Sequence, residues 1–124
     1  MEFIPIGKSE TKKNSVKKNS VRRTFYKLKA HKSFMLTIRL GEYVCEKINF
    51  RNGDKIILSY CKENNKIFKL EKSITGGSTL SSRHKYYLLF QATWNLENPK
   101  IDDLKIKDVL VHTLGDGYII LDFS

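Results

Sequence analysis

The chain has 124 residues, and 23 Lys and Arg against 13 Asp and Glu give it a net charge of +10. This length suits one compact domain, and an apolar fraction of 40% is enough for a core, which excludes wholesale disorder. No apolar run approaches the roughly 20 residues that span a bilayer, and two cysteines are too few for a disulfide framework, so we expect a cytoplasmic protein, associated with the nucleoid, or nuclear in a eukaryotic host.

The positive charge is concentrated at the N-terminus. Residues 1–33 hold ten basic and two acidic residues, a net charge of +8, and include the pentapeptide KKNSV twice in tandem from Lys12. Residues 8–24 contain few apolar side chains, so they cannot offset the entropy of ordering. We predict a basic arm over residues 1–33 that binds phosphates with salt-sensitive affinity. The predicted contacts are Lys12, Lys13, Lys17, Lys18, Arg22, Arg23, Lys27, Lys29 and Lys32, together with Arg39 in the following strand.

The tip of this arm contains Phe3, Ile4 and Ile6 but lacks the basic region and long apolar stretch of a secretory signal. If the tip docks on the core, the lysine-rich segment becomes a tethered loop. Besides nucleic acid, the arm suits an acidic protein partner. A membrane partner is disfavoured because no Trp, Phe or Leu interleaves with the lysines of residues 8–24.

The remaining residues, 34–124, are predicted to form a β-rich domain. Apolar residues alternate from Phe34 to Leu40, which is typical of a half-buried strand. Gly41–Asn49 has the spacing of a short amphipathic helix, and Asn49 suits a left-handed C-terminal cap. The segments 55–60 and 67–70 then predict a hairpin.

A loop rich in Ser and Gly, residues 73–82, separates a first β unit (34–72) from a second (84–124). Tyr86, Leu88, Phe90, Ala92 and Trp94 are predicted on one face of a strand. The later strands are predicted at Tyr86–Trp94, Val109–Leu114 and Tyr118–Phe123, the last two joined as a hairpin. We expect six strands and one short helix in a small β-barrel or swapped-hairpin-like body.

The stretch from Leu36 to Ile56 combines a strand, a short helix and a Gly-Asp-Lys sequence that opens a second hairpin. The residues that fit this scheme are Val44, Glu46, Lys47, Ile48, Phe50, Gly53, Asp54, Lys55 and Ile56. The pattern, over roughly residues 34–70, resembles AbrB-type swapped-hairpin transcription regulators. The resemblance implies a small dimeric DNA-binding protein in which hairpins from two chains interleave into one barrel.

This chain departs from the AbrB-type pattern at three places. Gly41 stands where proline is usual, and Leu36-Thr37 stands where Gly-Arg precedes the first strand. Cys45 and Glu46 replace basic residues that such proteins tend to use against phosphates. The DNA contacts would therefore have to come from the arm and Arg39.

We expect no catalytic site, metal site or cofactor. His31, His84 and His112 lie far apart in the chain, without the spacing of a ligand set. Cys45 and Cys61 are more typical of small buried hydrophobes than of reactive thiols. The adjacent carboxylates at 102–103, with Asp108, invite comparison with magnesium ligands but are commoner at a helix start.

Basic and aromatic residues interleave at Phe25-Tyr26 and at Tyr86-Tyr87. Such interleaving suits unpaired bases, which stack on rings while cations meet phosphates, although one ring of each pair is expected to fill the core.

The first functional prediction is a small, dimeric DNA-binding transcription regulator whose arm binds the phosphate backbone. Two alternatives stay open. One is an adaptor or inhibitor, such as a viral or phage protein, whose arm binds an acidic protein; the other is an RNA or single-strand binder that uses Tyr26 or Tyr87.

Overall fold

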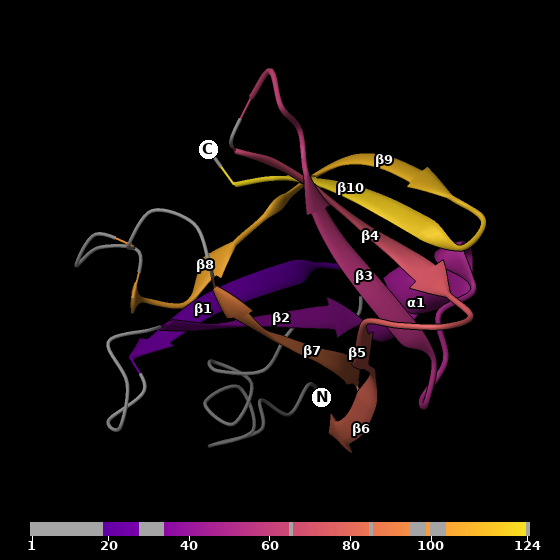
Figure 1. Cartoon of the computed structure of the whole chain (residues 1–124). Helices are drawn as coiled ribbons and strands as arrows, with labels where there is room; N and C mark the ends of the chain where they lie inside the picture. Colours follow the sequence, from indigo (N-terminus) through magenta and orange to yellow (C-terminus); the bar gives the residue numbers. More distant parts are fainter. Residues whose placement is uncertain are drawn as a thin grey trace, which may run out of the picture.

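The computed structural model describes residues 19–27, 34–64, 66–84, 86–94, 99 and 104–123. These residues form two antiparallel five-stranded sheets and one short helix (Figure 1). The first sheet has the strand order β6-β7-β2-β1-β8, and the second has β5-β3-β4-β10-β9. The strands are β1 (Val21–Lys27), β2 (Phe34–Gly41), β3 (Lys55–Tyr60), β4 (Ile67–Ser73), β5 (Ser78–Thr79), β6 (Ser81–His84), β7 (Tyr87–Trp94), β8 (Lys107–Asp108), β9 (Leu110–Gly115) and β10 (Tyr118–Asp122). The mainly β class predicted from the sequence is confirmed.

The core lies between the two sheets. Leu36, Ile38 and Leu40 alternate along β2 and are fully buried, as the sequence pattern predicted. They belong to one apolar cluster with Leu70 of the second sheet and Ile119 of β10. Because both sheets contribute to a single cluster, burial of apolar surface holds them together.

The helix α1 (Glu42–Ile48) covers one end of this core and contacts β2, β7 and β9 (Figure 1). It begins after Gly41 without a side-chain cap, and it buries Val44, Cys45 and Ile48. Asn49 ends the helix in the left-handed conformation, with φ 61°, so that the Phe50 N–H donates to the Cys45 carbonyl at 2.9 Å. The predicted helix and its cap are confirmed.

The predicted boundary between arm and body at residues 33 and 34 is wrong. Residues 21–27 form β1, which pairs along its whole length with β2. Val21 and Phe25 of β1 are buried in the core, and so is Arg23 between them. The arginine interrupts the apolar alternation, and for that reason the sequence pattern concealed the strand.

The described sheets are not closed into the expected barrel, because β5, β6, β8 and β9 each have a neighbour on one side only. The predicted loop over residues 73–82 contains β5 and the start of β6. These consecutive strands lie in different sheets and make a corner between them, as β8 and β9 do at the opposite side. Each sheet therefore combines strands from both predicted β units.

Among the described residues, none of the helical structure has the length and apolar character that a membrane crossing needs.

Candidate nucleic-acid interface

The outward face of the first sheet carries several of the charged and aromatic residues singled out in the sequence. Along β1, β2 and β7, alternate residues face the second sheet, so the residues between them face outward. The strand registers set Arg39 between Arg22 and Leu89, and Tyr26 beside Met35. Side chains from three neighbouring strands therefore share one surface.

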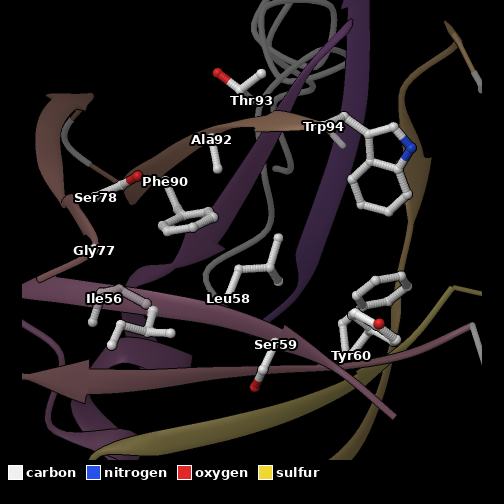
Figure 2. A pocket seen from close by; sticks show the side chains of 12 residues that line it. Ile56, Leu58, Ser59, Tyr60, Gly77, Ser78, Phe90, Ala92, Thr93 and Trp94 are labelled. Carbon is white, nitrogen blue, oxygen red and sulfur yellow. The ribbon is translucent and has the colours of Figure 1, made fainter. Parts of the chain in front are cut away.

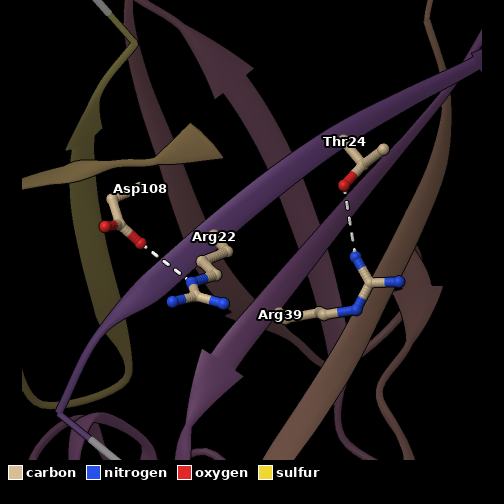
Figure 3. A network of polar contacts seen from close by, with 4 residues as sticks. All are labelled: Arg22, Thr24, Arg39 and Asp108. Carbon is tan, nitrogen blue, oxygen red and sulfur yellow. Dashed lines mark hydrogen bonds and ion pairs between the residues drawn. The ribbon is translucent and has the colours of Figure 1, made fainter. Parts of the chain in front are cut away.

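Arg39 is at the centre of this face. Its Nη1 donates to Thr24 Oγ1 at 3.3 Å (Figure 3), and its Nη2 donates to Tyr26 Oη at 3.3 Å. The guanidinium carbon lies 5.9 Å from the centroid of the Tyr87 ring, within the range of a cation–π contact. One arginine of β2 thus links a tyrosine of β1 to a tyrosine of β7. We call Tyr26, Arg39 and Tyr87 the Arg39 cluster.

The Arg39 cluster combines charge with exposed ring surface. Burial would lower the pKa of Arg39, but its interactions with the hydroxyls of Tyr26 and Tyr87 outweigh burial and raise the pKa, so the guanidinium stays protonated. Tyr26 is 44% exposed, while Arg39 and Tyr87 are half-buried. The cluster therefore offers a fixed cation and an accessible aromatic ring on a rigid sheet.

Two buried threonines, Thr24 and Thr37, accept hydrogen bonds from polar side chains next to the Arg39 cluster. Thr24 accepts the hydrogen bond from Arg39, and Thr37 Oγ1 accepts one from Gln91 Nε2 at 3.4 Å. Among the described residues, every buried side-chain nitrogen or oxygen has a hydrogen-bond partner. The positions of these side chains are thus fixed by satisfied bonds, which limits their motion when a ligand binds.

The other predicted contacts within the described residues differ in their surroundings. Arg22 Nε pairs with Asp108 Oδ1 at 2.9 Å (Figure 3), and this pair joins β1 to β8. Arg23 is buried between the sheets, with its guanidinium 5.2 Å from the Phe25 ring centroid and 5.5 Å from that of Phe123. Its surroundings fit a structural role in the core. Lys27 is exposed at the end of β1.

The remaining predicted contacts, Lys12, Lys13, Lys17, Lys18, Lys29 and Lys32, lie outside the described residues. The part of the predicted interface that can be placed is therefore the outward face of β1 and β2.

No family model, curated protein or solved structure matches this chain. The chemistry of the face is therefore inferred from its own residues.

The described residues hold no group of three or more His, Cys, Asp and Glu side chains that would suit a metal ion. His112 is exposed on β9, with its Nδ1 2.7 Å from Thr113 Oγ1. Asp108 is committed to Arg22. His31 and residues 102–103 lie outside the described residues, and the side chain of His84 is not described either.

The sequence marked Arg39, Tyr26 and Tyr87 separately, but it did not bring them together. It did predict that one ring of the first aromatic pair fills the core and the other lies at the rim, and Phe25 is buried while Tyr26 is exposed. The missing information was the register of β1 against β2 and of β2 against β7. Recognising β1 as a strand would have set Tyr26 and Arg39 on one face.

Proposed function

We propose that the chain binds single-stranded nucleic acid on the outward face of its first sheet. The observation that carries the proposal is the Arg39 cluster, in which a protonated guanidinium lies between two tyrosines of neighbouring strands. Unpaired bases stack on aromatic rings and on arginine planes, while cations neutralise the adjacent phosphates. Tyr26 supplies the exposed ring, and Arg39 supplies the charge.

A rigid sheet favours this use of the residues. Arg39 is held by two hydrogen bonds, so less side-chain entropy is lost when a phosphate or base meets it. The lysines of residues 8–18, which precede β1 in the sequence, add charge, and each phosphate they neutralise makes binding more sensitive to salt. Affinity in this proposal comes from both parts, while the preference for unpaired bases comes from the cluster.

Duplex DNA is the competing ligand. The dimeric DNA-binding regulator expected from the AbrB-type resemblance stays a prediction, and it requires base edges to be read in a groove or phosphates to be contacted along a duplex. An aromatic ring that binds by stacking on a base favours unpaired bases, because the faces of paired bases are already stacked on their neighbours in a duplex. Affinity for a single strand against a duplex of the same sequence therefore distinguishes the two functions.

The test is fluorescence anisotropy with labelled single-stranded DNA, single-stranded RNA and duplex DNA at one fixed salt concentration. We expect Tyr26→Ala to weaken single-strand binding by about 5- to 150-fold, because stacking contributes about 1–3 kcal/mol per base. Arg39→Gln should weaken it as well, because it removes the cation. The matched controls are Tyr43→Ala, an exposed tyrosine on α1, and Lys55→Ala, an exposed lysine on β3; both should bind like the wild type.

Equal affinity for duplex and single strand, together with an unchanged affinity for Tyr26→Ala, would reject the proposal and favour the duplex-binding regulator. Absence of any binding at low salt would reject both.

A further inference from the structure

The two sheets separate at one seam, between β3 and β7, and leave an open groove there (Figure 2). Along β3, the inward-facing Ile56 is fully buried, but Tyr60 is 54% exposed. Along β7, Phe90 is 1% exposed, whereas Ala92 and Trp94 are only half-buried. The solvent exposure of the inward-facing side chains of β3 and β7 therefore increases toward the end of the sandwich where Tyr60 and Trp94 lie.

The groove has a volume of about 410 Å³ and a mainly apolar lining. Figure 2 shows Phe90 and Ala92 directed into it from one sheet and Leu58 from the other, with Trp94 and Tyr60 at one end. A volume of this size accommodates several aliphatic side chains.

Along the groove, the edges of both bordering strands have no neighbouring strand among the described residues beyond β5 and β6. β5 pairs with β3 only at Lys55 and Ile56, and β6 pairs with β7 no further than Leu89. Within the described part of the chain, no other strand continues along these edges. Residues 57–60 and 90–93 therefore form edge segments beside which, among the described residues, no further strand is paired, and an extended segment can hydrogen-bond to such an edge.

We propose that this groove holds residues 3–6 of the same chain as an added strand. Residues 1–18 lie outside the described residues, and their one apolar cluster is Phe3, Ile4 and Ile6. In an extended segment, residues two apart point to the same side, so Ile4 and Ile6 enter the groove together. Pro5 then points away, and an edge strand tolerates its missing N–H.

The connection is long enough. Val21 pairs with Leu40, and Trp94 pairs with Phe34, so β1 begins six residues along the sheet from Trp94, or about 20 Å. Crossing from β1 to β7 adds two strand spacings, about 10 Å. The 14 residues from Gly7 to Ser20 span up to about 46 Å.

Tethering favours this occupant over a separate molecule. A segment attached to the same chain meets the groove at a high effective concentration, whereas an external peptide must pay the full cost of association. The added strand would continue the hydrogen bonding of β5 and β6 along the seam, and the lysines of residues 8–18 would lie in a loop fixed at both ends. This inference is independent of the proposed function.

The first experiment uses the fluorescence of Trp94, which is the one tryptophan of the chain and lines the groove. It is done on the full-length protein without nucleic acid. We expect the double variant Ile4→Asp/Ile6→Asp to shift Trp94 emission to longer wavelength and to increase its quenching by acrylamide. The matched control, Ser9→Asp/Ser15→Asp, adds the same charge to the same segment and should leave both readings unchanged.

The second experiment needs no variant. In the wild-type protein with labelled isoleucine methyl groups, we expect nuclear Overhauser contacts between the methyls of Ile4 and Ile6 and the indole of Trp94. Their absence would overturn the proposal. So would contacts that appear only between differently labelled copies in a mixed sample, because they would assign the groove to a second chain.

Discussion

The thiol of Cys45 lies against the core on the buried side of α1, where its Sγ donates to the Leu40 carbonyl at 3.5 Å. Burial raises the pKa of this thiol to about 12. Cys61, in contrast, is half-buried at the end of β3, with its Sγ 3.1 Å from Glu63 Oε2. The two thiols therefore differ in their access to solvent.

We expect one thiol per chain to react with a disulfide reagent at pH 8 in the native protein, and two after unfolding, because only the thiolate attacks and Cys45 stays protonated. Absorbance of the released reagent measures both numbers. The Cys61→Ser variant should lose the native reaction and keep the second thiol. Rapid native labelling of that variant would contradict the burial of Cys45.

Asp54 closes the turn between α1 and β3. Its carboxylate accepts a hydrogen bond from the Arg51 N–H at 2.8 Å and lies 3.1 Å from Lys72 Nζ of β4. Desolvation would raise the pKa of Asp54, but these two partners outweigh it and hold the pKa below its ordinary value. A carboxyl group with a lowered folded-state pKa stabilises the fold above its unfolded-state pKa and loses that effect as the pH falls through its folded-state pKa.

We therefore expect Asp54→Asn to lower the free energy of unfolding at pH 7 by about 1 kcal/mol. The difference from wild type should shrink as the pH falls below about 4 and should vanish once the wild-type carboxyl is protonated. Urea unfolding at a series of pH values measures it. Lys72→Gln, which removes the cation that pairs with Asp54, is the companion variant. A stability difference between Asp54→Asn and wild type that persisted at low pH would show that the charge of Asp54 is not its cause.

At the scale of the elements, the connection from β4 to β5 depends on Gly77. Gly77 has φ +97°, and a Cβ there would lie 2.2 Å from the Ile56 carbonyl oxygen. Gly53, in the turn before β3, has a similar φ of +91°, but a Cβ there would meet nothing within 4 Å. Both positions have a backbone conformation that would strain a residue with a side chain, and they differ in the space available for a Cβ.

We expect Gly53→Ala to cost about 1–2 kcal/mol in the free energy of unfolding, because it adds left-handed strain alone. Gly77→Ala should cost clearly more, because either the connection from β4 to β5 or the backbone of β3 must also move. Thermal or urea unfolding of both variants gives the comparison. An equal loss of unfolding free energy in the two variants would mean that the connection from β4 to β5 can move to make room for the Cβ at no energetic cost.

Most elements followed from the sequence because their alternation or capping was local. β2, β3, β7 and β10 each repeat apolar residues at every second position, and α1 has an apolar face and a suitable cap. β1 was missed because Arg23 occupies an inward position, where the Phe25 and Phe123 rings accommodate it. β5, β6 and β8 are too short for a period to be detected.

At the scale of the whole molecule, the sequence predicted the charged and aromatic residues of the candidate site but not their arrangement. The register of β1 against the next strand, β2, places Tyr26 on the same face as Arg39, and Tyr87 joins them because β2 also pairs with β7, which is distant along the chain. Because Arg23 interrupts the apolar alternation of β1, the local pattern did not reveal this strand and so did not yield its register. The concentration of positive charge in the N-terminal segment, next to a body of small net charge, could be predicted directly, because it requires only a count of charged residues along the sequence.

This concentration of charge predicts the salt dependence of the proposed binding. Replacing Lys12, Lys13, Lys17 and Lys18 by Gln should reduce the slope of log affinity against log salt by up to about 3, at about 0.7 per phosphate contact on a single strand. Deletion is less suitable, because β1 begins at Val21.

Anisotropy titrations over a salt series measure this slope. The matched control replaces four exposed lysines elsewhere, Lys47, Lys55, Lys62 and Lys66, which removes the same charge from the body. An equal loss of slope in the control would trace the effect to total charge and not to the N-terminal segment.

The interleaving of the two sheets has a consequence for how such a molecule changes over evolutionary time. The first sheet draws β1 and β2 from the beginning of the domain and β7 from beyond its midpoint, while the second sheet joins β3 and β4 to β10. Any single cut in the polypeptide leaves a fragment with open sheets and half a core. Genetic exchange therefore has no internal boundary at which to splice this domain, and fusion or transfer must take it whole.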